Sequence, residues 1–176
     1  MAGSSLGQIL TSGSHIREGQ DFRAKLLQAA IDRLSVARSL DEIISIVRTT
    51  ARSVCSADGV TFVLRDGDEC HYVEENAIGP LWKGQKFPAE TCISGWAMQN
   101  RKTAAIGDIF ADDRIPHDVY RKTFVKSLVM VPVGGESSVA AMGAYWVDTH
   151  AFTDHDIVAM EKLAMAISGA MQRLAA

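Results

Sequence analysis

The chain has 176 residues, of which 47% are apolar and 22% are charged, a composition typical of one globular domain and not of a disordered or fibrous protein. Its 18 basic and 21 acidic residues give a net charge of −3, which lacks the basic excess that nucleic-acid phosphates require. No run approaches the roughly 20 apolar residues that cross a bilayer, and three widely spaced cysteines make no disulfide framework. We therefore expect a cytoplasmic protein with neither a nucleic-acid nor a membrane partner.

The N-terminal segment differs in composition from the rest of the chain. Residues 1–19 are rich in Gly and Ser and show no sustained hydrophobic period, which predicts a flexible arm. The single domain is then expected to span residues 20–176.

Two helices are predicted before any strand. Apolar residues at helical spacing predict the first helix over residues 21–34. The second is predicted to begin after Ser39 and to end near residues 56–59. It begins with a capping-box pattern, in which the Ser39 hydroxyl accepts from the amide of Glu42 and the Glu42 carboxylate accepts from the amide of Ser39.

Strand patterns follow between residues 60 and 147. The predicted elements are a hairpin of residues 60–65 and 69–74, a short helix over 93–99 with Thr91 as its cap, a strand over 103–106, and a second hairpin of residues 127–133 and 139–147. Residues 108–126 lack a period and predict a long, partly helical surface crossing. Pro132 has no amide donor, which predicts that its strand lies at a sheet edge or carries a bulge.

The last predicted helix begins at the cap Thr153 and carries apolar residues spaced alternately by three and four. These are Ile157, Met160, Ala164, Ile167, Met171 and Leu174. Such spacing is typical of a narrow seam that meets another helix, but only two to three heptads are present, and a coiled-coil prediction needs about three to four. The seam therefore either packs on the protein's own sheet or forms a dimer helix that transmits a signal. Because the seam still runs at the final residues, we expect the helix to continue beyond them.

The order of these elements, together with several local motifs, resembles the GAF domain family. The motifs are Phe87-Pro-Ala-Glu-Thr-Cys-Ile-Ser-Gly-Trp96, Asn100-Arg-Lys-Thr103, Ile106-Gly-Asp-Ile109, Asp112-Asp113-Arg114, Ser127-Leu128-Val129-Met130-Val131-Pro132-Val133, and Ala144-Tyr145-Trp146 with Phe152-Thr153. The chain is most similar to the GAF sensor modules of bacterial sensor histidine kinases. The resemblance implies an α+β, PAS-related fold with an antiparallel sheet of about six strands. It also implies that the N- and C-terminal helices pack on one face and that loops and short helices cover a pocket on the other.

The resemblance implies a noncatalytic sensory domain that binds a small molecule and passes the change through its terminal helices to an output domain such as a kinase. A homodimer is expected, and a dimerisation module without a ligand is the alternative. A less favoured alternative is an enzyme similar to free methionine sulfoxide reductase. Ser94 stands about where that enzyme has a loop cysteine, residues 108–126 contain no cysteine, and Cys92 is left as a lone thiol. For the same reason no covalent bilin is expected in the 108–126 crossing.

A pocket in this family is expected to be walled by aromatic side chains with a few polar groups among them. The candidates are Trp82, Phe87, Cys92, Trp96, Asp108, Phe110, Asp113, Arg114, His117, Tyr120, Phe124, Met130 and Trp146. A core filled by the same aromatic residues is the alternative. No metal site is predicted, because the cysteines and histidines lack ligand spacing, and the sequence identifies neither a ligand nor a cofactor.

Overall fold

The computed structural model describes residues 6–176, with side chains from residue 13 onward. Its helices and strands are α1 (Leu6–Ser35), α2 (Leu40–Cys55), β1 (Gly59–Asp66), β2 (Glu69–Ala77), β3 (Lys86–Pro88), α3 (Ile93–Asn100), β4 (Ala104–Ile106), α4 (His117–Tyr120), β5 (Ser127–Val133), β6 (Ala140–Trp146) and α5 (Asp154–Ala175). The six strands pair antiparallel in the order β3-β2-β1-β6-β5-β4. The predicted fold class and sheet are confirmed.

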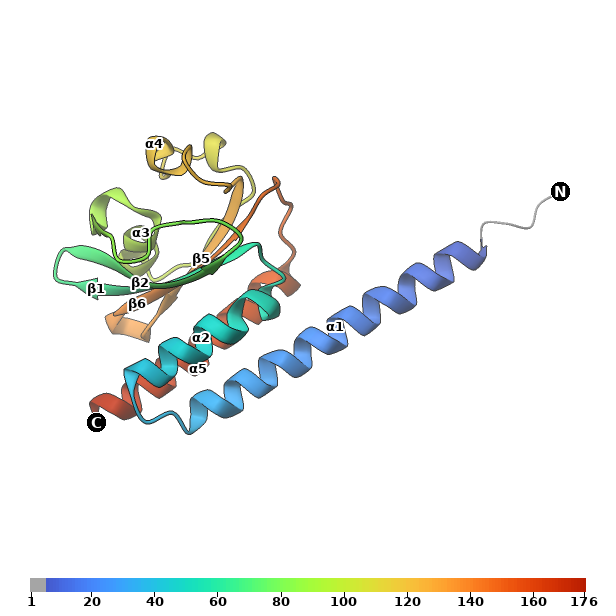
Figure 1. Ribbon diagram of the computed structural model, residues 1–176, viewed down its shortest axis with the longest axis horizontal. Helices are drawn as coiled ribbons and strands as arrows, with labels where there is room; N and C mark the ends of the chain where they lie inside the picture. Colours follow the sequence, from blue (N-terminus) through green and yellow to red (C-terminus); the bar gives the residue numbers. More distant parts are fainter. Residues whose placement is uncertain (1–5) are drawn as a thin grey trace.

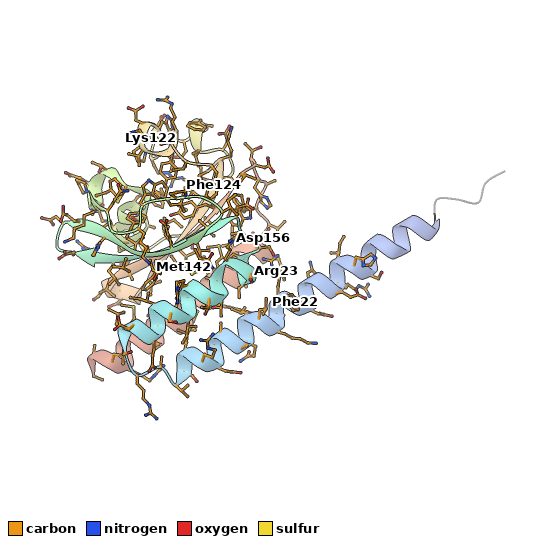
Figure 2. All side chains as sticks on the ribbon, viewed as in Figure 1. Phe22, Arg23, Lys122, Phe124, Met142 and Asp156 are labelled. Carbon is orange, nitrogen blue, oxygen red and sulfur yellow. The ribbon has the colours of Figure 1, made fainter. Side chains whose placement is uncertain are left out.

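The sheet lies between two layers. Helices α2 and α5 cover one face and α1 packs on their outer side, while α3, α4 and the long loops cover the other face (Figure 1). Because side chains alternate along a strand, β6 sends Met142 into the helix-side core and Tyr145 into the loop-side core. Figure 2 shows Met142 on the helix side of the sheet and Phe124 on the loop side. The fold therefore has two hydrophobic cores, one on each side of the sheet.

The sheet edge predicted for the strand of Pro132 is present only at the end of β5 where Pro132 lies. Strand β5 lies between β6 and β4, and its pairing with β6 runs without a register shift from Ser127 to Val133. Strand β4 is short, however, and pairs only with residues 128–130. Pro132 lies past its end, where β5 has no neighbour on that side and needs no amide donor.

Side-chain caps begin α2 and α5. The Ser39 hydroxyl accepts from the Glu42 amide at 3.1 Å, as predicted, but the Glu42 carboxylate accepts from the amide of Arg38 at 2.8 Å and not from that of Ser39. At α5 the reciprocal capping box is complete: the Thr153 hydroxyl accepts from the Asp156 amide, and the Asp156 carboxylate accepts from the Thr153 amide. Both caps satisfy amides that lack an intrahelical partner.

Helix α1 is longer than predicted. It begins at Leu6, so residues 6–19 are helical although no regular structure was expected there, and residues 1–5 of the predicted arm lie outside the described residues. Side chains 13–22 are all exposed, and Figure 1 shows this half of α1 extending away from the rest of the protein. An unpacked helical extension needs no apolar stripe, since each further residue adds a backbone hydrogen bond to an existing helix. In the described part of the chain, no helix is both long and apolar enough to cross a membrane.

Two arginines join α1 to the other helices. Arg23 donates to the carbonyl of Val54 at the end of α2 (3.0 Å) and lies 3.7 Å from the carboxylate of Asp156 at the start of α5 (Figure 2). At the opposite end of the layer, Arg173 of α5 donates to the carbonyl of Leu34 at 2.7 Å. Helices α1 and α5 therefore run parallel, with a polar contact near each end of their shared length.

The central part of the predicted seam on α5 faces the protein's own core. Met160, Ala164 and Ile167 are buried among α2 and the helix face of the sheet, whereas Ile157 and Met171 are half-buried and Leu174 is exposed. Met160, Ala164 and Ile167 do not form the surface of a dimer helix, because their side chains are already enclosed within one chain. Of the two interpretations of the seam, the structure supports packing on the protein's own sheet.

Candidate functional site

A small cavity of about 50 Å³ lies on the loop side of the sheet, between β2, the start of α3 and α4. Its lining residues are Tyr72, Trp82, Phe87, Thr91, Cys92, Pro116, Val119 and Tyr120. Pockets for drug-sized ligands measure roughly 300–1,000 Å³, and a water molecule occupies about 30 Å³ of liquid. In this conformation the cavity therefore has room for only one or two molecules the size of water.

Aromatic rings fill most of the space around the cavity. The indole of Trp82 lies 5.6 Å from the ring of Tyr72, 4.7 Å from that of Tyr120 and 5.6 Å from that of Tyr145, measured between centroids. Phe87 meets Tyr72 edge-on at 5.6 Å. Burial raises the pKa of all three tyrosine hydroxyls, so they remain neutral at physiological pH. This end of the fold thus combines a filled aromatic core with a residual cavity.

The polar atoms at the base of the cluster are all in contact with partners. The hydroxyls of Tyr145 and Thr61 form a hydrogen bond of 2.8 Å, and those of Tyr72 and Ser94 form one of 3.1 Å. The Ser94 hydroxyl also lies 3.3 Å from the sulfur of Cys92. Ser94 is fully buried, and its hydroxyl therefore links the wall of the cavity to the Cys92 thiol.

Cys92 occupies the N-cap position of α3, where Thr91 was predicted. Thr91 instead donates its hydroxyl to the carbonyl of Pro88 at 3.0 Å. Hydrogen bonding from Cys70 lowers the pKa of the Cys92 thiol to about 6, against the opposing effect of burial, and the Ser94 hydroxyl and the amides of Ser94 and Gly95 lower it further. The same pair interaction, together with burial, raises the pKa of Cys70. Cys92 is therefore not the lone thiol that the sequence indicated.

The crossing between β4 and β5 closes over this core through its own contacts. His117 lies with Nε2 at 3.0 Å from the carbonyl oxygens of both Ile109 and Asp112. Arg114 forms a two-point pair with Asp112, at 3.0 and 2.6 Å, and its guanidinium lies 4.3 Å above the ring of Trp96. These residues hold the crossing together, and none of them lines the cavity.

The predicted pocket residues divide into four groups. Trp82, Phe87, Cys92 and Tyr120 line the cavity. Met130 is buried in the same core, and Trp96 and Phe124 pack against it. The residues Asp108, Phe110, Asp113 and Arg114 are exposed, and His117 is half-buried. The prediction for Trp146 is wrong. Trp146 follows Tyr145 on β6 and therefore points to the other face of the sheet. There it packs on the helix-side core and donates to the carbonyl of Ser56 at 2.9 Å.

Several residues around the cavity were missed, namely Tyr72, Thr91, Pro116, Val119 and, beneath them, Tyr145. The period of two over residues 69–74 does place Cys70 and Tyr72 on one face of their strand, so a signal for this wall exists in the sequence. For residues 13–176, no group of three or more His, Cys, Asp or Glu side chains is arranged to hold a metal ion.

Comparison with known proteins agrees with this architecture. Many solved structures share the fold, among them the following three. The free methionine-R-sulfoxide reductase of Neisseria meningitidis, in complex with its substrate, has a TM-score of 0.75 at 15% identity, covering 89% of this chain and 92% of that chain. The GAF domain of an Acinetobacter phosphoenolpyruvate-protein phosphotransferase has a TM-score of 0.72 at 13% identity, covering 86% and 94%. The GAF domain of a two-component sensor histidine kinase from Bacillus halodurans has a TM-score of 0.66 at 17% identity, covering 79% and 97%.

These identities are too low to carry a function, and they support the fold alone. No curated protein matches the sequence at a significant level. Residues 37–172, which run from the α1–α2 turn almost to the end of α5, match the GAF domain family. The chain belongs to the GAF domain family, a sensory and regulatory fold.

Proposed function

We propose that this chain is the noncatalytic, cytoplasmic sensory module of a bacterial signalling protein, such as a histidine kinase, and that a small molecule bound at the aromatic cavity alters the packing of α1 and α5. The observation that carries the proposal is the arrangement of α1. Its second half is packed against α2 and α5 and joined to them by Arg23 and Arg173, and its first half extends away from the domain.

The small size of the cavity supports coupling between binding and conformation. A ligand larger than about two water molecules needs the loops over the cavity to move outward, so it binds an arrangement that differs from this one. Any such ligand shifts the population toward the open arrangement by its difference in affinity for the two states. The loops that must move include residues 109–120, which α4 and the His117 contacts hold together.

A regulatory role is preferred over an enzymatic one because of the thiols that the chain lacks. Its cysteines are Cys55, Cys70 and Cys92, and the crossing between β4 and β5 has none. Ser94, on α3, stands about where free methionine sulfoxide reductase has a loop cysteine.

Native mass spectrometry of the freshly purified chain tests whether it binds a small molecule. We expect the wild type to retain a compound that is released on denaturation. Val119→Trp, which fills the cavity from α4, should abolish this excess mass. Val158→Trp adds the same indole to the exposed face of α5 and should leave the excess mass unchanged. Hydrogen exchange in residues 13–35 should differ between the loaded and the stripped protein, since the proposal requires α1 to respond. A wild type without bound mass, or equal retention by both variants, would contradict it.

A homodimer is the second part of the proposal, and exposed apolar residues on the helix layer favour it. Phe22 of α1 is 63% exposed, and Met165 of α5 is 74% exposed. The double variant Phe22→Glu with Met165→Glu should reduce the mass measured by light scattering from that of a dimer to that of a monomer, because burying two charges opposes association. Ile78→Glu, at an exposed residue just after β2, is the matched control and should remain dimeric. A monomeric wild type would refute the homodimer.

A further inference from the structure

Two of the three cysteines meet in the loop-side core. Cys70 is fully buried on β2, and Cys92 is 93% buried at the start of α3, being 7% exposed. The interaction between the two side chains raises the pKa of Cys70 and lowers that of Cys92, and the Ser94 hydroxyl lies 3.3 Å from the Cys92 sulfur. Both cysteines are free, so the pair is a reduced dithiol.

The backbone brings the two cysteines together. Strand β3 runs back along β2 with Phe87 opposite Cys70, and the amide of Ala89 donates to the carbonyl of Asp68 at 2.8 Å. Residues 89–91 then make one tight turn that returns the chain to Cys92. Because the ladder fixes this register, the pairing of the two thiols is built into the fold.

The two thiols have opposite protonation. The interaction with Cys70 is the largest of the effects that lower the pKa of Cys92 to about 6, and the Ser94 hydroxyl, 3.3 Å from the sulfur, and the nearby amides of Gly95 and Ser94 lower it further. Cys70 stays protonated beside it. The other titratable groups around Cys92 are the neutral tyrosines Tyr72, Tyr120 and Tyr145, and the positive charge of Arg65 acts on Cys70, where it opposes the rise in pKa. A thiolate next to a thiol is the arrangement that oxidation to a disulfide requires.

The cavity gives this pair an entrance. Cys92 and Thr91 both line it, whereas Cys70 does not. A volume of about 50 Å³ has room for hydrogen peroxide, which is close to water in size. The oxidant therefore meets Cys92 first and Cys70 afterwards.

We propose that Cys92 and Cys70 form a redox site that reacts with hydrogen peroxide. The Cys92 thiolate attacks one peroxide oxygen, the O–O bond breaks, and hydroxide leaves, so that Cys92 becomes a sulfenic acid. The Cys70 thiol then gives its proton to the sulfenic oxygen as its sulfur attacks the Cys92 sulfur, the S–O bond breaks, a disulfide forms, and the oxygen leaves as water. The hydroxide takes up the proton that Cys92 lost on ionisation, so the peroxide is reduced to two waters as the two sulfurs are oxidised together. The proposal does not require the ligand proposed above, which would occupy the same cavity.

Peptide mapping of the peroxide-treated chain, after alkylation of the remaining thiols, tests the pair directly. The expected product is a peptide linked between Cys70 and Cys92 within one chain, with Cys55 fully alkylated. Cys55 is the internal control: it is buried on α2 in the other core, and burial raises its pKa to about 12. Oxidation of Cys55 at the same rate, a disulfide between chains, or a Cys92 sulfinic acid without the link would overturn the proposal.

Variants of each cysteine, and the oxidation rate at a chosen pH, distinguish the role of Cys92 from that of Cys70. Cys70→Ala should stop the reaction at a Cys92 sulfenic acid that dimedone traps, and Cys92→Ala should abolish rapid oxidation, while Cys55→Ala behaves like the wild type. The rate at which peroxide oxidises the wild-type protein is a second test, and it requires no substitution that could impair folding. At pH 6 about half of Cys92 is thiolate, whereas only about 0.3% of an ordinary thiol is ionised. A thiolate of lower pKa is also a weaker nucleophile, so we expect Cys92 to react with peroxide about tenfold faster than free cysteine. A rate equal to that of free cysteine at pH 6 contradicts the assignment.

Discussion

Gly95→Ala is expected to destabilise the domain by at least about 3 kcal/mol, the range reached only when a substitution forces the backbone apart. A Cβ built on Gly95 would lie 1.8 Å from the carbonyl oxygen of Ala89 and 2.5 Å from its carbonyl carbon. Both are backbone atoms, so no side-chain rotation can relieve the overlap. The first turn of α3 would have to move away from residues 89–91, and the amides that contact Cys92 would move with it.

Urea denaturation measures this effect as a fall in the midpoint. Gly19→Ala is the matched control, because it is the same substitution in a helix and nothing lies within 4 Å of its added methyl group. There we expect no loss of stability and a gain in helix content, since alanine favours a helix over glycine by up to about 1 kcal/mol. Equal midpoints for Gly95→Ala and the wild type would show that α3 does not approach Ala89 as described.

The elements that could be predicted from the sequence are those specified by neighbouring residues. The Ser39 and Thr153 caps act over three residues, and the Asp66-Gly67-Asp68 turn joins two strands whose alternation is visible by itself. Each signal lies within one short segment, so a single sequence is enough to find it.

The parts that could not be predicted depend on what lies against a segment. The three-four spacing of Met160, Ala164 and Ile167 requires an apolar neighbour but does not say whether that neighbour is α2 or a second chain. Residues 13–22 of α1 show no apolar period, and their side chains are exposed. Both ambiguities are resolved only by tertiary contacts.

The candidate site shows the same limit. The alternation in β2 places Cys70 and Tyr72 on one face, but only the register of β3 against β2 determines that Cys92 returns to Cys70. The sequence prediction places Trp146 on the wrong side of the sheet, because Trp146 directly follows Tyr145 on β6 and so points to the opposite face. Pairing between strands is a long-range property, and a one-residue difference reverses the face of a side chain.

Ile167→Asp is expected to leave the chain largely unfolded. Ile167 is completely buried in the helix-side core, and the substitution both removes its packing, worth about 2–5 kcal/mol in similar truncations, and buries a carboxylate without a partner. Together these costs approach the roughly 5–15 kcal/mol that stabilise a typical domain. Circular dichroism should show loss of most helix signal.

Met165→Asp is the control that gives this result its meaning, because Met165 is two residues away on α5 and 74% exposed. Met165→Asp should stay folded and keep the helix signal of the wild type in circular dichroism. If the seam were purely a dimer helix, Ile167→Asp would give a folded monomer with a normal midpoint, because exposed charges cost little in an isolated chain. A cooperative melt at the wild-type temperature for Ile167→Asp would therefore contradict the placement of α5 on its own sheet. Loss of folding in that variant, beside a stable Met165→Asp, would assign this part of the helix to the core of one chain and leave only its outer face for a partner.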